Sequence, residues 1–522
     1  MKKYFIIVLF LMAGKGIFSQ NVNISNGNIY DGEPFIAVNP VNPQNMVVAW
    51  MGYLPYSKIY IKTRATFNGG KTWSAMQVIS HVNSSYGSAD PSMAFDDSGN
   101  VSLSFVDYNK TSSSGAVFVV KSTDGGLSWS NPVQVINANF DSHKPIDRPW
   151  ISIDRSGGNY SGNIYITTIP PTVLGYLPPP YHPYLTLSSD GGSSFNQSRY
   201  LDTLNWLSGN VYRKPMATNC VAADGTFYAV YPSYVYSQNS LPQYIIASSD
   251  KGGAGFSYHT VFTLSPGSNV TDSLAKKGYL ILADPSNANH LAFVYLSNYY
   301  GDADVFIRET FDKGATWGNP VRVNDDPVAN NRMQDLLWGD FDDNGNLVIA
   351  WRDRRNGSDS TFKTAYEIWA AYRDKDSLSF GANFRISDTL VPYDTVLGPA
   401  GNDFMCVKLA NDTLNAVWAD TRNGKLNIWF QRTAANGAAL IVEPLGSEKI
   451  PLVEVYPNPT SSKLWVKGKG VEKVLVYNSL NKLVKRVEGA ESIDLKGLPD
   501  AFYFLEIFTE EGVVVKKIVK GE

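Results

Sequence analysis

The stretch Ser122-Thr123-Asp124-Gly125-Gly126-Leu127-Ser128-Trp129 is the most informative part of this chain, because close copies of it recur. A second good copy ends at Trp317, and three looser copies end at Trp73, Phe195 and Phe256. The Asp or Asn positions of these copies lie 56, 66, 60 and 62 residues apart, at Asn68, Asp124, Asp190, Asp250 and Asp312. A nearly fixed period of this size predicts one supersecondary unit that is repeated in space.

Each copy has the chemistry of a hairpin turn. It follows a strand-like run such as Ala116–Val120. The Asp side chain can accept hydrogen bonds from backbone N–H groups a few residues further on, and the glycine supplies a positive φ. Because turn stabilisation explains these residues fully, we interpret the copies as structural rather than catalytic.

The repeated pattern resembles the Asp-box of sialidase-like β-propellers, and the resemblance covers about 400 residues. It implies an all-β ring of four-stranded blades. Sialidases have six blades, whereas seven apolar first strands begin here near Phe35, Ser92, Trp150, Met216, Tyr279, Leu336 and Phe404. We therefore predict seven blades, with six as the alternative. The last unit lacks a fourth strand, and residues Asn21–Ser25 match the missing pattern, so the N-terminus is expected to close the ring.

Composition and segment patterns divide the chain into four parts. The 522 residues include 67 aromatics, 43 glycines and 28 prolines, which suits many short strands and turns. Residues 1–19 are typical of a signal peptide, with Lys2 and Lys3 before an apolar stretch that is too short to span a bilayer. We expect a propeller at 20–433, a linker at 434–451 and a small β-sandwich at 452–522. No later segment is expected to cross a membrane.

Charge and cysteine content exclude several function classes. Without the signal segment the net charge is about −6, which argues against a nucleic-acid partner. Cys220 and Cys406 are expected to be buried free thiols in distant blades. The stretch Asp340–Gly345 imitates a calcium loop, but Trp351 stands where the loop needs Glu, so a plain turn is expected. We expect no metal and no cofactor.

The end of the chain resembles the C-terminal sorting domain of the type IX secretion system of Bacteroidetes. The resemblance rests on Tyr456-Pro457-Asn458-Pro459 and on the ending Lys516-Lys517-Ile518-Val519. Ala501 departs from the family's usual glycine. The resemblance implies that residues 452–522 engage the type IX export machinery, with a secreted or surface-attached product. The alternative from the residues alone is a β-sandwich that was appended for stability.

Charged residues are concentrated where one mouth of the ring is expected. In a four-stranded blade the start of the first strand and the end of the second strand lie on the rim opposite the Asp-boxes. A concave mouth with convergent polar groups is the default site. The catalytic candidates there are Asp147, Asp90, Arg148, Arg213 and Arg332. The candidates for a binding rim are Asp335, Asp353, Arg354, Asp403, Asp420 and Arg422.

The resemblance assigns roles to some of these residues. Sialidases bind a carboxylate with three arginines, for which Arg148, Arg213 and Arg332 are the counterparts, with Asp90 or Asp147 as the acid. The family's Phe-Arg-Ile-Pro opening is absent, since Glu33-Pro34-Phe35-Ile36 stands there, and Tyr393 is the only nucleophile suggested. The repeat Trp-x-Asp-x-Arg-Asn-Gly at Trp351 and Trp418 is either a braced turn or a ligand-facing pair.

These patterns leave two functions open. The first is an exported, sialidase-like propeller that binds or cleaves glycans outside the cell, as an exo-sialidase-like glycoside hydrolase if it is an enzyme. The second is a non-catalytic propeller for adhesion, scaffolding or ligand binding. The aromatic residues of the Pro-rich insertion at 170–183 fit either a sugar-stacking wall or a rim cover. With only five histidines, no Ser/His/Asp set supports a protease.

Overall fold

The computed structural model divides the chain into two compact units, residues 1–440 and 441–522. The residues that it describes are 20–27, 30–54, 58–109, 113–171, 180–210, 217–264, 278–358, 361, 363–393, 402–438, 440, 453–478, 482–489, 491–510 and 512–521. The expected signal segment at 1–19 and most of the expected linker at 434–451 lie outside this set.

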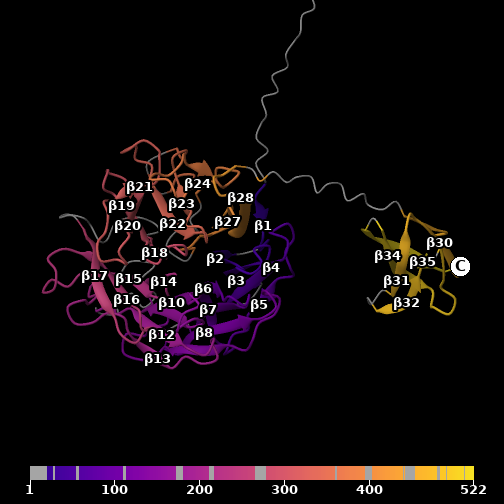
Figure 1. The fold of residues 1–522 in the computed structure, drawn as a ribbon, viewed down its shortest axis with the longest axis horizontal. Helices are drawn as coiled ribbons and strands as arrows, with labels where there is room; N and C mark the ends of the chain where they lie inside the picture. Colours follow the sequence, from indigo (N-terminus) through magenta and orange to yellow (C-terminus); the bar gives the residue numbers. More distant parts are fainter. Residues whose placement is uncertain are drawn as a thin grey trace, which may run out of the picture. The chain divides into compact units, whose positions relative to one another are not determined.

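The first unit consists of seven antiparallel four-stranded sheets among the described residues, which follow one another in chain order around a ring (Figure 1). We number these sheets as blades 1 to 7. Blades 1 and 2 contain β2 (Asp31–Val38), β3 (Met46–Tyr53), β4 (Ile59–Thr66), β5 (Gln77–Val78), β6 (Gly87–Phe95), β7 (Val101–Tyr108), β8 (Gly115–Ser122) and β9 (Val133–Asn137). Blades 3 and 4 contain β10 (Asp147–Ile153), β11 (Ile164–Ile169), β12 (Tyr184–Ser188), β13 (Gln197–Tyr200), β14 (Thr218–Val221), β15 (Phe227–Ser233), β16 (Gln243–Ser249) and β17 (Ser257–Thr263).

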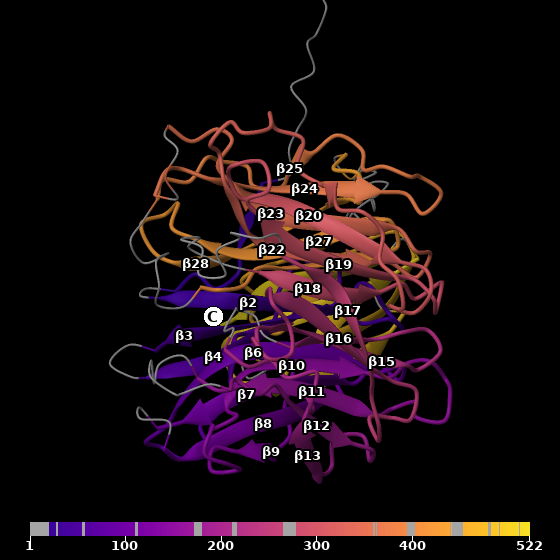
Figure 2. The ribbon, with the colours of Figure 1, turned by 90° about the vertical axis from the view of Figure 1, so that its left-hand side faces the viewer.

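The remaining blades complete the ring, and the same sheets are visible from the side in Figure 2. Blades 5 and 6 contain β18 (Tyr279–Ala283), β19 (Leu291–Ser297), β20 (Asp304–Thr310), β21 (Val321–Arg322), β22 (Gln334–Phe341), β23 (Leu347–Asp353), β24 (Glu367–Arg373) and β25 (Phe384–Arg385). Blade 7 contains β26 (Cys406–Ala410), β27 (Thr413–Asp420), β28 (Asn427–Ala434) and β1 (Val22–Asn23). The seven-bladed prediction is therefore confirmed for the described residues.

The N-terminal strand closes the ring, as the sequence predicted. β1 pairs antiparallel with β28, with Val22 opposite Phe430 and Asn23 opposite Trp429. The Ile24 N–H then donates to the Ile428 carbonyl at 2.8 Å. β1 thereby covers the backbone edge that β28 would otherwise expose.

The second strand of each blade is buried on both faces, since every blade packs between two neighbours. β27 shows this well, because all of its residues are buried. Trp50, Trp351 and Trp418 occupy the same place on the second strands of three blades and are fully buried. Each indole N–H is satisfied by an aspartate, at 2.8 Å from Asp31, 2.6 Å from Asp353 and 2.7 Å from Asp420.

The Asp-boxes are turn braces. Asp124 Oδ1 accepts the backbone N–H groups of Leu127 at 3.0 Å and Ser128 at 2.9 Å. The Ser122 hydroxyl donates to Asp124 and accepts the Gly126 N–H at 2.8 Å. Gly126 has φ = 97°, and a Cβ there would lie 2.5 Å from Val47 of the preceding blade. Every contact of the box is therefore used within the fold.

The fourth box along the chain differs from its sequence assignment. Ser249 Oγ, not Ser248, accepts the N–H of the glycine four residues on, Gly253, at 3.0 Å. This is the hydrogen bond that Ser122 makes in the second box, so Lys251 rather than Asp250 takes the place of the box aspartate. The assignment of Asp250 was therefore wrong by one residue: counted from Ser249, the box reaches its aromatic, Phe256, at the same spacing as Ser122 reaches Trp129.

The box aspartate yields a stability prediction. Although slight burial opposes it, hydrogen bonds from Ser128 and Ser122 lower the pKa of Asp124 to about 2. We expect Asp124→Ala to lower the free energy of unfolding by about 1 kcal/mol, as the loss of a helix cap does. Because the folded-state pKa is depressed, the wild type should lose this contribution as the pH falls from about 4 to 2, and the variant should not. Urea unfolding against pH measures both, and a pH-independent difference would contradict the idea.

The calcium-like stretch of the sequence is an ordinary hairpin turn, as expected. Asp342 Oδ1 accepts the N–H groups of Asn344 at 3.0 Å and Asn346 at 2.8 Å. Asp96 does the same for Ser98 and Asn100 in the second blade. These aspartates therefore brace the turn between the first and second strands.

The second unit is a pair of small antiparallel sheets. One contains β29 (Glu454–Tyr456), β30 (Lys463–Lys467) and β33 (Ser492–Asp494). The other contains β31 (Val471–Asn478), β32 (Leu483–Glu488), β34 (Ala501–Thr509) and β35 (Gly512–Lys520). A separate core that includes Leu464, Val476, Leu505 and Ile518 lies between them. This agrees with the expected β-sandwich.

Candidate functional site

Three consecutive inner strands carry the same backbone irregularity at the same place. β2, β6 and β10 each contain a β-bulge, where the register with the second strand shifts. At the bulges Glu33, Asp90 and Arg148 adopt left-handed φ values of 53°, 54° and 49°, and each precedes a proline. β22 has the same bulge with Leu336 at φ = 55°, so the bulge belongs to the blade geometry, and in blades 1 to 3 a charged residue occupies it. The bulges turn three charged side chains toward the axis of the ring.

These residues form a compact group that we call the axial cluster: Glu33, Asp90, Asp147, Arg148 and Asp403. The Arg148 guanidinium contacts the Asp403 carboxylate, and the Arg148 N–H donates to Asp90 Oδ2 at 3.3 Å. The Asp403 N–H donates to Glu33 Oε1 at 3.2 Å. The cluster therefore joins blades 1, 2, 3 and 7. Four of its members were sequence candidates, and the structure brings them together.

Burial and neighbouring charges shift the pKa values of two of the carboxyls, Glu33 and Asp90, in opposite directions. Burial raises the pKa of Glu33 well above its usual value, and repulsion by Asp90 and Asp403 adds to this. Burial acts on Asp90 in the same sense, but the Arg148 guanidinium and N–H outweigh it and hold the pKa of Asp90 below its usual value. Glu33 is thus protonated where Asp90 is ionised. Two neighbouring carboxyls whose pKa values differ in this way are candidates for acid and base roles.

Several polar atoms around the cluster have no hydrogen-bond partner among the described residues. They are buried side-chain atoms: Tyr30 Oη, Glu33 Oε2, Arg148 Nε and Nη1, and Asn402 Oδ1 and Nδ2. An unsatisfied buried polar group costs about 1–3 kcal/mol. Donors and acceptors are both present, so a polar occupant that can both donate and accept would satisfy them. Burial and the nearby carboxyls also raise the pKa of Tyr30 and of Tyr108, which keeps both phenols neutral.

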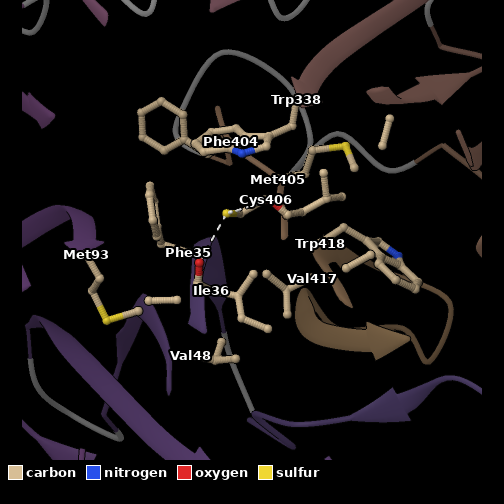
Figure 3. Close-up of a cluster of buried hydrophobic side chains, with 14 of the residues drawn as sticks. Phe35, Ile36, Val48, Met93, Trp338, Phe404, Met405, Cys406, Val417 and Trp418 are labelled. Atoms are coloured by element: carbon tan, nitrogen blue, oxygen red, sulfur yellow. Dashed lines mark hydrogen bonds between the residues drawn. The ribbon is translucent and has the colours of Figure 1, made fainter. Parts of the chain in front are cut away.

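An aromatic layer closes the channel beneath the cluster. Phe35, Trp150 and Phe404 follow the cluster residues by one or two positions along their strands, and Trp338 comes from β22. The Trp150 and Trp338 rings stack at 5.2 Å, Phe35 meets Trp338 edge-on at 5.3 Å, and Phe404 meets Trp150 at 5.9 Å. Figure 3 shows Phe35, Trp338 and Phe404 in one cluster with Met93 and Cys406. This aromatic layer gives the axial cluster a dry floor, which strengthens its electrostatic interactions.

The predicted rim residues of blades 6 and 7 are occupied by ion pairs. Asp335 accepts from Arg352 at 2.7 Å and from Arg354 at 3.0 Å. Asp353 binds Arg355 at 2.9 Å, and Asp420 binds Arg422 at 2.6 Å. Both Arg355 and Arg422 also lie over an indole, Trp369 at 4.0 Å and Trp429 at 4.3 Å. The repeated Trp-x-Asp-x-Arg motif therefore has the contacts of a braced turn.

The other candidates do not join the axial cluster in the described part of the chain. Arg213 lies outside the described residues. The Arg332 N–H donates to Asp302 Oδ2 at 2.8 Å in the connection between blades 5 and 6. Tyr393 packs against the core cluster and lies after β25, in the connection between blades 6 and 7. Of the two described arginines that the sialidase resemblance suggested, Arg148 is the one that joins the axial cluster.

Sequence reasoning placed Glu33 among the charges at the mouth without making it a site candidate, and it passed over Tyr30 and Asn402. A signal for Glu33 was present, because Glu-Pro, Asp-Pro and Arg-Pro pairs occupy the same register of three successive first strands. No pattern marks Tyr30 or Asn402, since their positions depend on how the chain enters the inner strands. No group of three or more His, Cys, Asp or Glu residues in the described ranges has the arrangement of a metal site.

Comparison with known proteins identifies one part of the chain. Residues 454–521 match the family described as secretion system C-terminal sorting domain. The presence of this domain shows that the protein is exported, to the outer cell surface or into the medium. No helix among the described residues is suited to crossing a lipid bilayer.

No curated protein matches the chain. Among solved structures, a protein of unknown function from Dyadobacter fermentans is 15% identical, with a TM-score of 0.41, and covers 68% of this chain and 97% of its own. An alpha-L-arabinanase from Penicillium chrysogenum is 12% identical (TM-score 0.41; 79% and 98% covered). The NanB sialidase from Streptococcus pneumoniae is 11% identical (TM-score 0.41; 80% and 71% covered). The strand pairing, rather than these distant matches, defines the fold.

Proposed function

We propose that the protein is an exported glycoside hydrolase whose axial cluster binds and cleaves a neutral glycan outside the cell. Residues 1–19 serve as the signal peptide, and residues 452–522 engage the type IX export machinery of a Bacteroidetes cell. The single observation that carries the proposal is the pair of adjacent carboxyls with opposite pKa shifts, Glu33 and Asp90. Two carboxyls held in different protonation states can act as the acid and the base of glycoside cleavage.

The chemistry follows from the protonation states. Glu33 gives its proton to the glycosidic oxygen as the bond from that oxygen to the anomeric carbon breaks. The ionised Asp90 stabilises the positive charge that develops on the sugar and takes a proton from the water that attacks the anomeric carbon. Arg148 holds Asp90 in its ionised form, and the unpaired atoms of Tyr30, Arg148 and Asn402 supply hydrogen bonds to sugar hydroxyls.

The charge of the axial cluster favours a neutral sugar over sialic acid. Among the described residues of the axial cluster, four carboxyl groups surround the Arg148 guanidinium, which already contacts Asp403. A substrate carboxylate would meet repulsion from these four groups, and the Asp403 carboxylate would compete with it for Arg148. We therefore propose a neutral glycan in place of the anionic sugar that the sialidase resemblance suggested.

The test is a panel of chromogenic neutral glycosides and a sialoside, assayed with the mature chain and with Glu33→Gln and Asp90→Asn. We expect turnover of a neutral glycoside, with kcat reduced about 10²–10⁴-fold in each variant. Since Glu33 must be protonated, kcat should decline as the pH rises through its elevated pKa, and Glu33→Gln should abolish that limb. Asp343→Asn, at an exposed box-side turn, is the matched control and should keep full activity.

Non-catalytic ligand binding at the same cluster is the second candidate function. It is favoured by the depth of the charged groups, since Glu33 is 2% exposed and Arg148 is 4% exposed. Saturable glycan binding without turnover, weakened by Glu33→Gln, would establish this alternative. If the chain neither turns over nor binds any glycoside of the panel, both functions are rejected for this cluster.

A further inference from the structure

A second cavity lies on the other side of the aromatic layer. It has a volume of about 510 Å³ and occupies the half of the central channel that faces the Asp-boxes. Inner-strand residues of all seven blades line it, from Ala37 of blade 1 to Leu409 of blade 7. The axial cluster and this box-side cavity are thus separated by Phe35, Trp150 and Trp338, which line the cavity as its floor.

The floor and walls of the box-side cavity offer different contacts. The stacked Trp150 and Trp338 rings, with the edge-on Phe35 ring, form an aromatic base. The walls consist of inner strands, which pair with a second strand on one side only. Their other backbone edge faces the channel, as in any edge strand. A ligand therefore meets an apolar face at one end and hydrogen-bonding groups around its circumference.

Two polar side-chain atoms at the wall have no partner among the described residues. They are Ser152 Oγ and Asn219 Oδ1, which are both buried. The Asn219 amide is fixed, because its Nδ2 donates to the Trp150 carbonyl at 2.7 Å and to Thr167 Oγ1 at 2.8 Å. Both atoms lie beneath the cavity surface, so a ligand hydroxyl reaches Asn219 Oδ1 or Ser152 Oγ only when neighbouring side chains move aside. Satisfying these atoms would recover part of the cost of burying them.

The charged groups at the cavity balance one another. Lys408 Nζ lies 2.7 Å from Asp340 Oδ1 at the wall. At the rim Arg155 of blade 3 lies 3.0 Å from Asp97 of blade 2 and 3.9 Å from Asp343 of blade 6. Each cation therefore already has a carboxylate partner, and the lining carries no excess charge to attract an ion.

From these features we propose that the box-side cavity is a separate binding site for a neutral sugar of about disaccharide size. A sugar ring has apolar C–H faces that pack on aromatic rings and hydroxyls that both donate and accept hydrogen bonds. The cavity volume falls within the range of small-ligand sites, ~300–1,000 Å³. The site does not depend on the function of the axial cluster, because the aromatic layer lies between them.

Cys220 provides a direct reporter of occupancy. Cys220 is a partly buried residue of the cavity lining, and burial raises the pKa of its thiol, so it alkylates slowly, whereas Cys406 is fully buried. Alkylation of the full chain by N-ethylmaleimide is followed by mass spectrometry, with cellobiose or N,N′-diacetylchitobiose added at up to ~50 mM, which would saturate a site of millimolar affinity. We expect at least one of these sugars to slow Cys220 alkylation about fivefold or more in a saturable way. Glucuronic acid at the same concentration should not, and Cys406 should stay unmodified.

Two variants and a second measurement complete the test. Ser152→Ala removes one hydrogen-bonding group and should raise the half-protecting concentration about 2–10-fold. Glu33→Gln should leave it unchanged, which separates this site from the proposed function. Saturation-transfer NMR of the sugar with the native chain reports binding even if Cys220 reacts too slowly to follow, and Ser152→Trp, which fills the cavity, should remove the signal.

The proposal is overturned by any of three results. One is that neither sugar protects Cys220 nor gives an NMR signal. Another is that the NMR signal survives in Ser152→Trp, which would place binding elsewhere. The last is that glucuronic acid protects as well as the neutral sugars, which would refute the neutral ligand class.

Discussion

Replacing Asp335 by asparagine is expected to lower the free energy of unfolding by about 3–5 kcal/mol. Asp335 is fully buried and accepts four hydrogen bonds from Arg352 and Arg354, which are themselves almost fully buried. The carboxylate neutralises both cations, and they hold the pKa of Asp335 below its usual value. Asparagine keeps the shape but leaves two guanidinium groups without a counter-charge. Urea denaturation, or calorimetry of the mature chain, measures the difference.

The matched control for Asp335→Asn is Asp97→Asn. Asp97 forms an ion pair with Arg155 at 3.0 Å, but its side chain is 55% exposed, so its loss should cost less than about 1 kcal/mol. Because the folded-state pKa of Asp335 is depressed, its stabilising contribution is present near neutral pH and is lost as the pH falls below the ordinary aspartate value of about 3.9. If Asp335→Asn and Asp97→Asn lowered the free energy of unfolding equally, burial would not determine the contribution of the Asp335 ion pairs.

Removing residues 20–26 is expected to open the ring. The segment supplies β1, the buried Ile24 side chain and the Asn21 amide, which donates to the Ile386 carbonyl at 3.2 Å and to Gln431 at 2.9 Å. Losing a buried Ile and several hydrogen bonds should cost at least about 3 kcal/mol. The bare edge of β28 should also promote self-association. Thermal unfolding and light scattering measure the two effects.

A peptide of residues 20–26 added to the shortened chain should restore stability, and the same peptide with Ile24→Asp should not. Val22→Ala in the full chain is the mild control, because Val22 is largely exposed. A shortened chain that stays monomeric with unchanged thermal stability would show that blade 7 holds with three strands.

The repeated units could be predicted from sequence because each blade uses local rules. Strand runs alternate with turn residues, and the Asp124 and Asp312 boxes carry their hydrogen-bond partners within a few residues. Closure by Asn21–Ser25 followed from counting strands in the last blade. The fourth box was misplaced at Asp250 because Ser248-Ser249 and Gly252-Gly253 offer two registers, and the hydrogen bond rather than the residue types selects Ser249 and Gly253.

The candidate site could be predicted only in part. Charges before the first strands indicated the mouth, which located Asp90, Asp147, Arg148 and Asp403. Sequence does not show which charges neutralise each other, so Asp335, Asp353 and Asp420 looked available although arginines bind them. The pKa difference between Glu33 and Asp90 depends on burial at the axis, which arises only when four blades meet.

The chain leaves the ring on the side of the Asp-boxes. β28 ends at Ala434, and the Ala435 N–H donates to the carbonyl of Asp412, in the turn between β26 and β27. The boxes lie on the same rim as that turn. In blade 1 the corresponding turn, between β2 and β3, contains Asn45, whose side-chain amide donates to the carbonyl of the box residue Gly125 at 3.0 Å. The axial cluster and the end of β28 therefore lie at opposite mouths of the propeller channel.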